Sequence, residues 1–244
     1  MALPRWRDRL LHALFPAPCL HCCTPLPAAG GHLGLCAVCR DRLRPLPAGG
    51  CAVCGQPLDA ADLPPGWRCG ACRERPPAFD RLLARWSYEG PLPAVVQGLK
   101  FRRLDYLGRH LGEALAAAFA EEVAGADAVV AVPLHWRRWL SRGYNQAEQI
   151  ARPLAARLGL PLLPALARCR ATPPQTALGK AARHANLRRA FRARRPARLG
   201  SLCLLLVDDV ATTGATLDAA AAELKRAGAA AVTAIAAART LAGS

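Results

Sequence analysis

The chain has 244 residues, of which 52% are hydrophobic and 20% charged, and its formal net charge is +16. This composition excludes a disordered or fibrous protein, and the length suffices for one sizeable core with a small accessory domain. No apolar run approaches the roughly 18 residues of a membrane span, so we expect no membrane insertion.

The positive charge is concentrated in one segment. Thirty of the 33 basic residues are arginine, a bias that a GC-rich genome can produce, so the total charge is a weak argument. Residues 135–198, however, hold 15 basic side chains against a single acid, Glu148, whereas residues 1–134 hold 15 basic and 12 acidic ones. This distribution favours a polyanionic partner, either a phosphate-rich small molecule or a nucleic acid, over a solvated arginine-rich surface.

Residues 1–18 are predicted to form a short amphipathic helix. Trp6, Leu10 and Leu14 recur at helical spacing with charges between them, and two prolines follow. The stretch has neither the uncharged apolar centre nor the small-residue cleavage site of a secretory signal. We therefore expect a cytoplasmic protein.

Residues 19–76 carry four CxxC pairs, with 13, 11 and 14 residues between successive pairs. Disulfide frameworks are rare in the cytosol, whereas two CxxC turns together complete a closed four-cysteine zinc site. We expect a double zinc ribbon with two structural sites, whose metal supplies much of its folding free energy. The predicted ligands are Cys19, Cys22, Cys36, Cys39, Cys51, Cys54, Cys69 and Cys72.

The pairing of these turns has two solutions. Sequential pairing joins the first turn with the second and the third with the fourth, while a cross-braced arrangement joins the first with the third. The stretches CLHCCTPL and CAVCGQPL repeat one plan, which favours sequential pairing. Cys23 could replace Cys22 as a ligand, but the CxxC spacing favours Cys22.

Residues 81–244 are predicted to form an α/β domain. Fully apolar strands that alternate with amphipathic helices indicate a parallel sheet covered on both faces, with ligands at the carboxyl ends of the strands. The expected strands are 82–88, 128–133, 202–207 and 231–236. The expected helices are 91–100, 105–123, 144–158 and 215–227.

The stretch LLLVDDVATTGATL, residues 204–217, combines an apolar strand, two adjacent acids and a threonine-rich loop that enters a helix. Gly214 permits a tight turn, and threonine hydroxyls and free backbone N–H groups at a helix N-terminus suit a phosphate. Carboxylates in front of such a loop would repel a bare phosphate, but they suit sugar hydroxyls or a bridging Mg²⁺. A threonine N-cap after a solvated acidic turn would explain only part of this set. The stretch therefore predicts a site for a phosphorylated sugar.

VDDVATTGAT resembles the phosphoribosyl-pyrophosphate (PRPP) binding loop of type I phosphoribosyltransferases. This resemblance implies that PRPP binds with Mg²⁺ and that Asp208 and Asp209 hold its ribose. The residues it implies for the 5′-phosphate are Ala211, Thr212, Thr213, Gly214, Ala215 and Thr216.

The whole chain resembles the ComF family, which includes the GntX-like proteins, because four CxxC turns precede a phosphoribosyltransferase domain. The likeness extends to GLKF (98–101), VPLHWRRWLSRGYNQAEQIA (132–151) and RCRATPPQTALGKAARHANLRRAF (168–191). Lys100 is interpreted equally well as a site residue or as a helix-end cation. The candidates on the pyrophosphate side are Arg137, Arg138, Arg142, Asn145 and Gln146.

Two alternatives accompany these candidates. Asn145 and Gln146 could instead cap the helix predicted over 144–158. The segment 168–185 suits a mobile flap, for which the resemblance implies Gln175, Arg183 and Asn186.

The sequence identifies no acceptor and no catalytic residue, since His110, His135 and His184 qualify as a general base by residue type alone. Three functions stay open. One is transfer of phosphoribose to an unidentified acceptor. A second, which the ComF resemblance implies, is a role in DNA uptake alongside competence or DNA-processing proteins, with single-stranded DNA held by the zinc ribbons and the basic segment. The third is PRPP sensing without turnover.

Overall fold

The structure, a computed structural model, describes residues 16–27, 31–47, 49–58, 63–169, 190–195 and 199–241, with only the backbone described at 137 and 138. Residues 1–15, most of the expected N-terminal helix, lie outside these ranges. The flap candidates Gln175, Arg183 and Asn186 lie outside them as well.

The centre of the molecule is a four-stranded sheet in the order β1-β6-β5-β2, in which every neighbouring pair is parallel. Its interior strands are almost wholly apolar and buried, as a sheet covered on both faces requires. The strands are β1 (Arg81–Ser87), β2 (Ala128–Ala131), β5 (Cys203–Ala211) and β6 (Ala231–Arg239). This confirms the predicted parallel α/β architecture.

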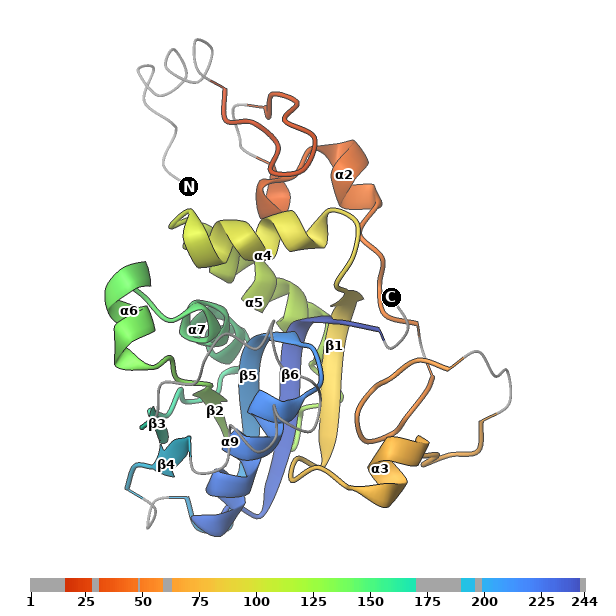
Figure 1. Ribbon diagram of the computed structural model, residues 1–244, viewed down its shortest axis with the longest axis vertical. Coiled ribbons are helices and arrows are strands. Elements are labelled where there is room, and N and C mark those ends of the chain that lie inside the picture. The colour runs from red at the N-terminus through yellow and green to blue at the C-terminus, as the bar shows by residue number, and fades with distance from the viewer. Residues whose placement is uncertain are drawn as a thin grey trace.

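Helices cover both faces of the sheet (Figure 1). One face packs against α4 (Leu92–Phe101), α5 (Tyr106–Phe119) and α7 (Gln146–Leu158). The other packs against α9 (Ala215–Arg226) and against a small antiparallel sheet of β3 (Leu166–Arg168) and β4 (Phe191–Ala193). The contact of α5 with α7 is close, because a Cβ at Gly112 would lie 2.3 Å from the Ile150 carbonyl oxygen.

The first four-cysteine region, with η1 (His32–Gly34) and α2 (Ala37–Asp41), lies beyond α4 and α5 (Figure 1). Its buried Cys19 and Cys39 belong to the same apolar core as those helices. The Leu33 N–H donates to Nδ1 of His110 on α5 at 3.0 Å. Burial lowers the pKa of His110, which keeps the imidazole neutral and able to accept this bond.

The second four-cysteine region, with α3 (Gly70–Glu74), lies beside β1 (Figure 1). Its buried Cys51 and Cys72 join the core on the α9 face of the sheet. The Leu82 N–H of β1 donates to the Val53 carbonyl at 2.7 Å, which fixes this region to the edge strand. Each cysteine region is therefore continuous with one of the two cores.

Three details differ from the expected elements. The structure has α6 (Trp136–Arg142) where we expected a loop, and β3 and β4 border the segment expected as a flap. Strand β5 continues to Ala211, so Asp208 and Asp209 lie inside the strand and not at its exit. Among the helices that the structure describes, none is long and apolar enough to cross a membrane.

Candidate functional site

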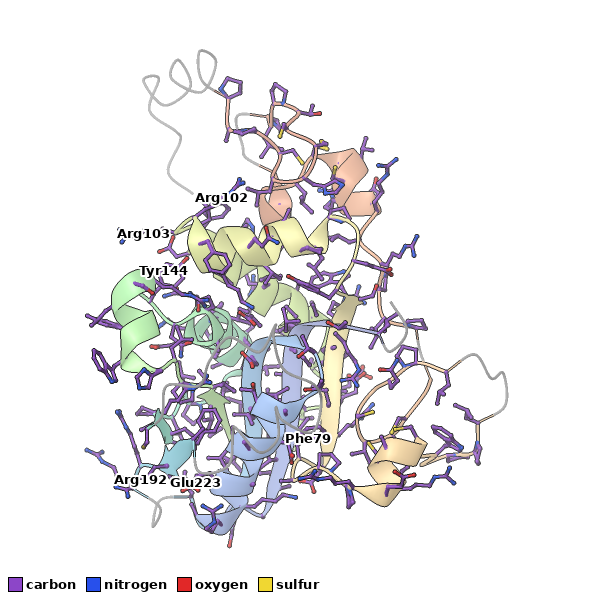
Figure 2. The ribbon with its side chains drawn as sticks, viewed as in Figure 1. Phe79, Arg102, Arg103, Tyr144, Arg192 and Glu223 are labelled. Atoms are coloured by element: carbon purple, nitrogen blue, oxygen red, sulfur yellow. The ribbon has the colours of Figure 1, made fainter. Side chains whose placement is uncertain are left out.

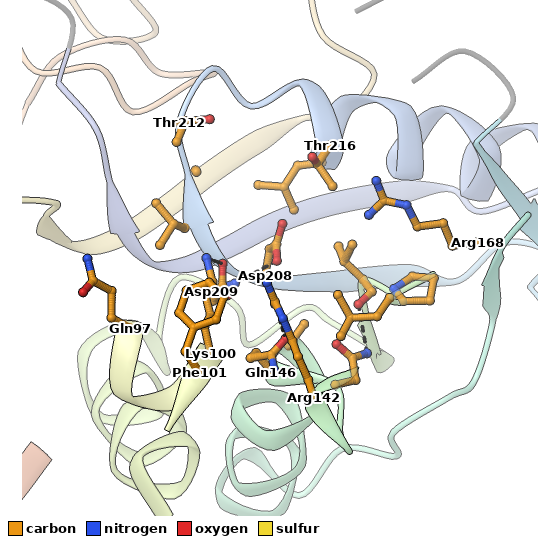
Figure 3. A pocket seen from close by; sticks show the side chains of 18 of the residues that line it. Gln97, Lys100, Phe101, Arg142, Gln146, Arg168, Asp208, Asp209, Thr212 and Thr216 are labelled. Carbon is orange, nitrogen blue, oxygen red and sulfur yellow. Dashed lines mark hydrogen bonds and ion pairs between the residues drawn. The ribbon is translucent and has the colours of Figure 1, made fainter. Parts of the chain in front are cut away.

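A cleft of about 770 Å³ opens at the carboxyl ends of β5 and β2 (Figure 3). It brings together most of the predicted site residues, from two separate parts of the sequence, 142–146 and 208–216. These are Arg142, Asn145, Gln146, Asp208, Asp209, Ala211, Thr212, Gly214 and Thr216. Thr213 and Ala215 do not line it; Ala215 is buried as the first residue of α9.

The two acids meet different surroundings. Asp209 is buried and forms an ion pair with Lys100, whose Nζ lies 2.9 Å from the Asp209 carboxylate. Asp208 extends toward the middle of the cleft (Figure 3). Burial and the neighbouring Asp209 carboxylate raise the pKa of Asp208 to about 7, although Lys100 and Arg168 act in the opposite direction. Asp208 is thus the acid that would gain most from a cation or from donated hydroxyl groups.

The loop from β5 to α9 has the geometry of an anion site. Gly214 is the N-cap residue of α9 at φ +77°, a conformation that favours glycine. The Ala215 N–H at the helix start donates a long hydrogen bond, of 3.4 Å, to Thr213 Oγ1. The first N–H groups of α9 therefore face the loop, with the positive end of the helix dipole behind them. A Cβ at Gly214 would lie 3.7 Å from the ring of Phe79, which is labelled in Figure 2, so this ring packs against the loop.

On the β2 side, Asn145 and Gln146 do not cap α7 through their side chains. Asn145 Nδ2 donates to the Val132 carbonyl at 3.0 Å and so fixes the start of α7 to the end of β2. The Arg142 guanidinium donates to Gln146 Oε1 at 2.9 Å and lies 5.0 Å from the ring centre of Phe101. Asn145 therefore positions the start of α7, and Gln146 positions the guanidinium of Arg142 at the edge of the cleft. Arg137 and Arg138 belong to α6.

Several lining residues were missed by the sequence reasoning. Lys100, whose role we left open, faces the acid pair, and Tyr88 directly follows the carboxyl end of β1. The rule that ligands bind at strand ends could have identified Tyr88. Arg168 had no such signal, because its strand β3 was not predicted. Other missed residues include Gln97, Phe101, Arg103 and Ser141.

The eight cysteines form two sets, Cys19/Cys22/Cys36/Cys39 and Cys51/Cys54/Cys69/Cys72, in each of which the sulfur atoms lie within 4.8 Å of one another. This confirms sequential pairing. A tetrahedral zinc with Zn–S bonds of about 2.3 Å separates its sulfurs by about 3.8 Å. The Sγ atoms of Cys22 and Cys36 are 3.6 Å apart, and those of Cys54 and Cys69 are 3.8 Å apart. Both sets therefore fit zinc.

The second set has two further features of a metal site. Burial acts to raise the pKa of Cys51, but hydrogen bonds from the backbone of Cys54, Cys69 and Val53 lower it to about 6, which favours a thiolate. Arg239, at the end of β6, is buried next to this set, and its Nε and Nη1 atoms have no hydrogen-bond partner among the described residues. A four-thiolate zinc centre, with a net charge of −2, would compensate that buried cation.

The parallel sheet, the acid pair near the end of an interior strand and the loop into α9 define a protein of the type I phosphoribosyltransferase fold with two N-terminal four-cysteine sets. No protein-family model matches the sequence. The DNA utilization protein YhgH of Salmonella typhi is 37% identical over 227 residues, which covers 89% of this chain and 94% of that protein. The Escherichia coli K12 protein of the same name is 36% identical over 223 residues, with the same coverage.

Competence protein F of Haemophilus influenzae is 31% identical over 218 residues, which covers 86% of this chain and 91% of that protein. The chain belongs to the ComF family, as its cysteine and loop motifs predicted. Among solved structures, a glutamine PRPP amidotransferase of B. subtilis complexed with ADP and GMP aligns with 52% of this chain and 25% of its own, at 24% identity and a TM-score of 0.37.

Proposed function

We propose that the cleft binds PRPP, or another phosphoribosyl compound, together with Mg²⁺, and that the protein acts in DNA utilization or uptake. One observation carries the first part: an acid pair, an anion-binding helix start and fixed cations line the same cleft. The names of the related proteins, DNA utilization protein and competence protein F, support the second part.

Each part of the ligand has a suitable counterpart. The ribose hydroxyls, or Mg²⁺, would bind the carboxylates of Asp208 and Asp209. The 5′-phosphate would accept hydrogen bonds from the loop 211–216 and the start of α9. The pyrophosphate would lie toward Arg142 and the loop after β2, where its charge meets a guanidinium.

We also propose that each four-cysteine set holds a structural zinc ion. Four thiolates leave no open coordination position, so neither ion would bind a substrate. The fit of the sulfur separations and the buried Arg239 cation support this assignment.

Phosphoribosyl transfer is the reaction class that such a site serves, because cations facing the pyrophosphate stabilise its departure from the ribose. No histidine is among the described residues that line the cleft, and we assign no general base. Transfer and sensing differ in one measurable respect: a transferase releases pyrophosphate when an acceptor is present, whereas a sensor returns PRPP intact.

Calorimetry of the zinc-loaded protein with PRPP and Mg²⁺ tests the binding proposal. We expect saturable binding by the wild type and at least about 100-fold weaker binding by Asp208→Asn/Asp209→Asn, because two charge-assisted contacts are lost. The matched control is Glu121→Gln/Glu122→Gln, an adjacent pair of exposed acids outside the cleft, which should bind as the wild type does. Absence of binding by folded wild type, or equal binding by the Asp variant, would contradict the proposal.

A further inference from the structure

A second groove, of about 620 Å³, borders the PRPP cleft. It lies along α6, the start of α7 and the small β3–β4 sheet, and it shares Pro133, Leu134, Asn145 and Arg168 with the cleft. The proposed PRPP contacts do not account for its other lining residues.

Two tryptophans of α6 line this groove with large exposed surfaces. Trp136 is 58% exposed and Trp139 is 52% exposed, and they are the exposed tryptophans among the residues that the structure describes. By contrast, Trp86 is 7% exposed. Exposed aromatic side chains that share a groove mark a binding surface, because their burial by a partner is strongly favourable.

The charge of the groove restricts the partner. Three arginines line it, Arg152, Arg168 and Arg194, against one acid, Glu148, which already forms a 2.7 Å ion pair with Arg152. Exposed aromatic rings beside arginine side chains suit single-stranded nucleic acid, whose bases stack on the rings while its phosphates contact the cations. A duplex keeps its base faces stacked inside and would leave the tryptophans unused.

We propose that this groove binds single-stranded DNA, with bases stacked on Trp136 and Trp139 and phosphates against Arg152 and Arg194. The choice of DNA as the polymer rests on the proposed role in DNA utilization or uptake. The aromatic and cationic surface itself is independent of PRPP. Because the groove adjoins the cleft, a bound strand would pass next to the phosphoribosyl site.

Fluorescence anisotropy of a labelled oligothymidine with the zinc-loaded protein tests the proposal. Loss of stacking should weaken binding at least about fivefold for each of Trp136→Ala and Trp139→Ala. Leu140→Ala is the matched control, since Leu140 is 65% exposed on the same helix but does not line the groove. Oligothymidine should also quench the tryptophan emission of the wild type, and quench it less in the double variant.

The arginines have a separate readout. Arg152→Gln and Arg194→Gln should each reduce the slope of log affinity against log salt by about 0.7. Arg157→Gln is the control for charge, because Arg157 lies on α7 outside both cavities and is 65% exposed. It should leave the slope unchanged.

The two binding activities should be lost independently of each other. The tryptophan variants should keep wild-type affinity for PRPP with Mg²⁺, and Asp208→Asn/Asp209→Asn should keep wild-type affinity for oligothymidine. Equal oligothymidine binding by wild type and the double tryptophan variant would overturn the proposal. A preference for duplex DNA over oligothymidine would overturn it as well. It would also be overturned if the only effect of the double tryptophan variant were a loss of self-association in sedimentation, since the face would then be an interface between two copies.

Discussion

Adjacent residues of one strand point to opposite sides, and this places Asp208 and Asp209 in different surroundings. Asp209 is neutralised by Lys100 at 2.9 Å, so its charge is balanced before any ligand arrives. The negative charge of Asp208 is the less compensated of the two, and burial together with the Asp209 carboxylate raises the pKa of Asp208 to about 7. The charged form of Asp208 is therefore disfavoured, and a cation or a group of hydroxyls beside it would stabilise the carboxylate.

This imbalance predicts how ligand affinity depends on pH. A ligand that needs the Asp208 carboxylate must displace its proton, so affinity for PRPP with Mg²⁺ should rise about tenfold between pH 6 and pH 8. Calorimetry in buffers of different ionisation enthalpy should detect the released proton near pH 7. Asp208→Asn should retain only the pH dependence of the PRPP phosphates. An equal proton release by wild type and variant would contradict the assignment.

The same shift has the opposite effect on stability. The folded-state pKa of Asp208 is raised above its ordinary value, so the ligand-free protein binds more protons than the unfolded chain and loses stability as pH rises from about 4 to about 7. Asp208→Asn should therefore be more stable than wild type at pH 8, by up to about 4 kcal/mol, in denaturant unfolding without ligand. At pH 4 the two should be equal.

At the scale of elements, Arg239 connects the second four-cysteine set to the sheet. Arg239 is 5% exposed, and its Nη2 lies 3.4 Å from Gln56 Oε1. In the β5–β6 register it pairs with Ala211, the last residue of β5. Burial lowers the pKa of this side chain, while the thiol groups of the second set act to raise it. The charge balance of Arg239 therefore depends on the metal.

The effect of Arg239→Met on the free energy of unfolding should have opposite signs in zinc-loaded and in metal-free protein. In zinc-loaded protein the substitution removes the cation facing an anionic centre, so stability and zinc affinity should fall, by about 1–3 kcal/mol in unfolding. In metal-free protein the set carries less negative charge, because the pKa of Cys51 is lowered but burial raises those of Cys54 and Cys72. There the substitution removes a poorly compensated buried cation and should be neutral or stabilising. Denaturant unfolding with and without zinc measures both. The control is Arg226→Met, since Arg226 is 67% exposed and its loss should have little effect in either state. If Arg239→Met destabilises the zinc-loaded and the metal-free protein equally, the proposed charge compensation is wrong.

Elements with a strong local pattern could be predicted, and elements that depend on distant pairing could not. The four apolar strands and the flanking long helices each carry their own periodicity, and CxxC spacing fixes two ligands at a time. In contrast, α6 has only seven residues, and its arginines and serine gave no helical pattern, so the sequence indicated a loop there. Strands β3 and β4 have three residues each and exist only because they pair across a long insertion.

The site divides in the same way. Asp208, Asp209 and the loop that follows lie within one stretch of sequence, so their presence at one cleft could be predicted from the sequence. Lys100 and Arg168 face the same cleft from α4 and β3, and only the packing of those elements brings them there. The roles of Asn145 and Gln146 as positioning side chains also required the coordinates, because a helix cap has the same sequence signature.

At the scale of the whole molecule, the cysteine regions are parts of the two cores and do not build a core of their own. Cys19 and Cys39 pack in the α4–α5–α7 core, and Cys51 and Cys72 pack in the α9 core. Backbone hydrogen bonds connect both regions to β1, including Leu46 N–H to Arg85 O and Leu82 N–H to Val53 O. Loss of either metal should therefore weaken the sheet domain.

Zinc removal should lower the stability of the entire protein in a single transition. Structural zinc contributes about 10–16 kcal/mol in isolated fingers, comparable with the total stability of a domain. A loss of even about 5 kcal/mol should lower Tm by about 10–20 °C for a chain of this size. Cys36→Ser/Cys39→Ser and Cys69→Ser/Cys72→Ser remove the sites singly, and Cys23→Ser is the control outside both sets. Far-UV circular dichroism during chelator titration should show the helices of the sheet domain melting with the ribbons. If those helices keep the original Tm while only the cysteine regions unfold, the ribbons are an independent domain and the shared cores contribute little.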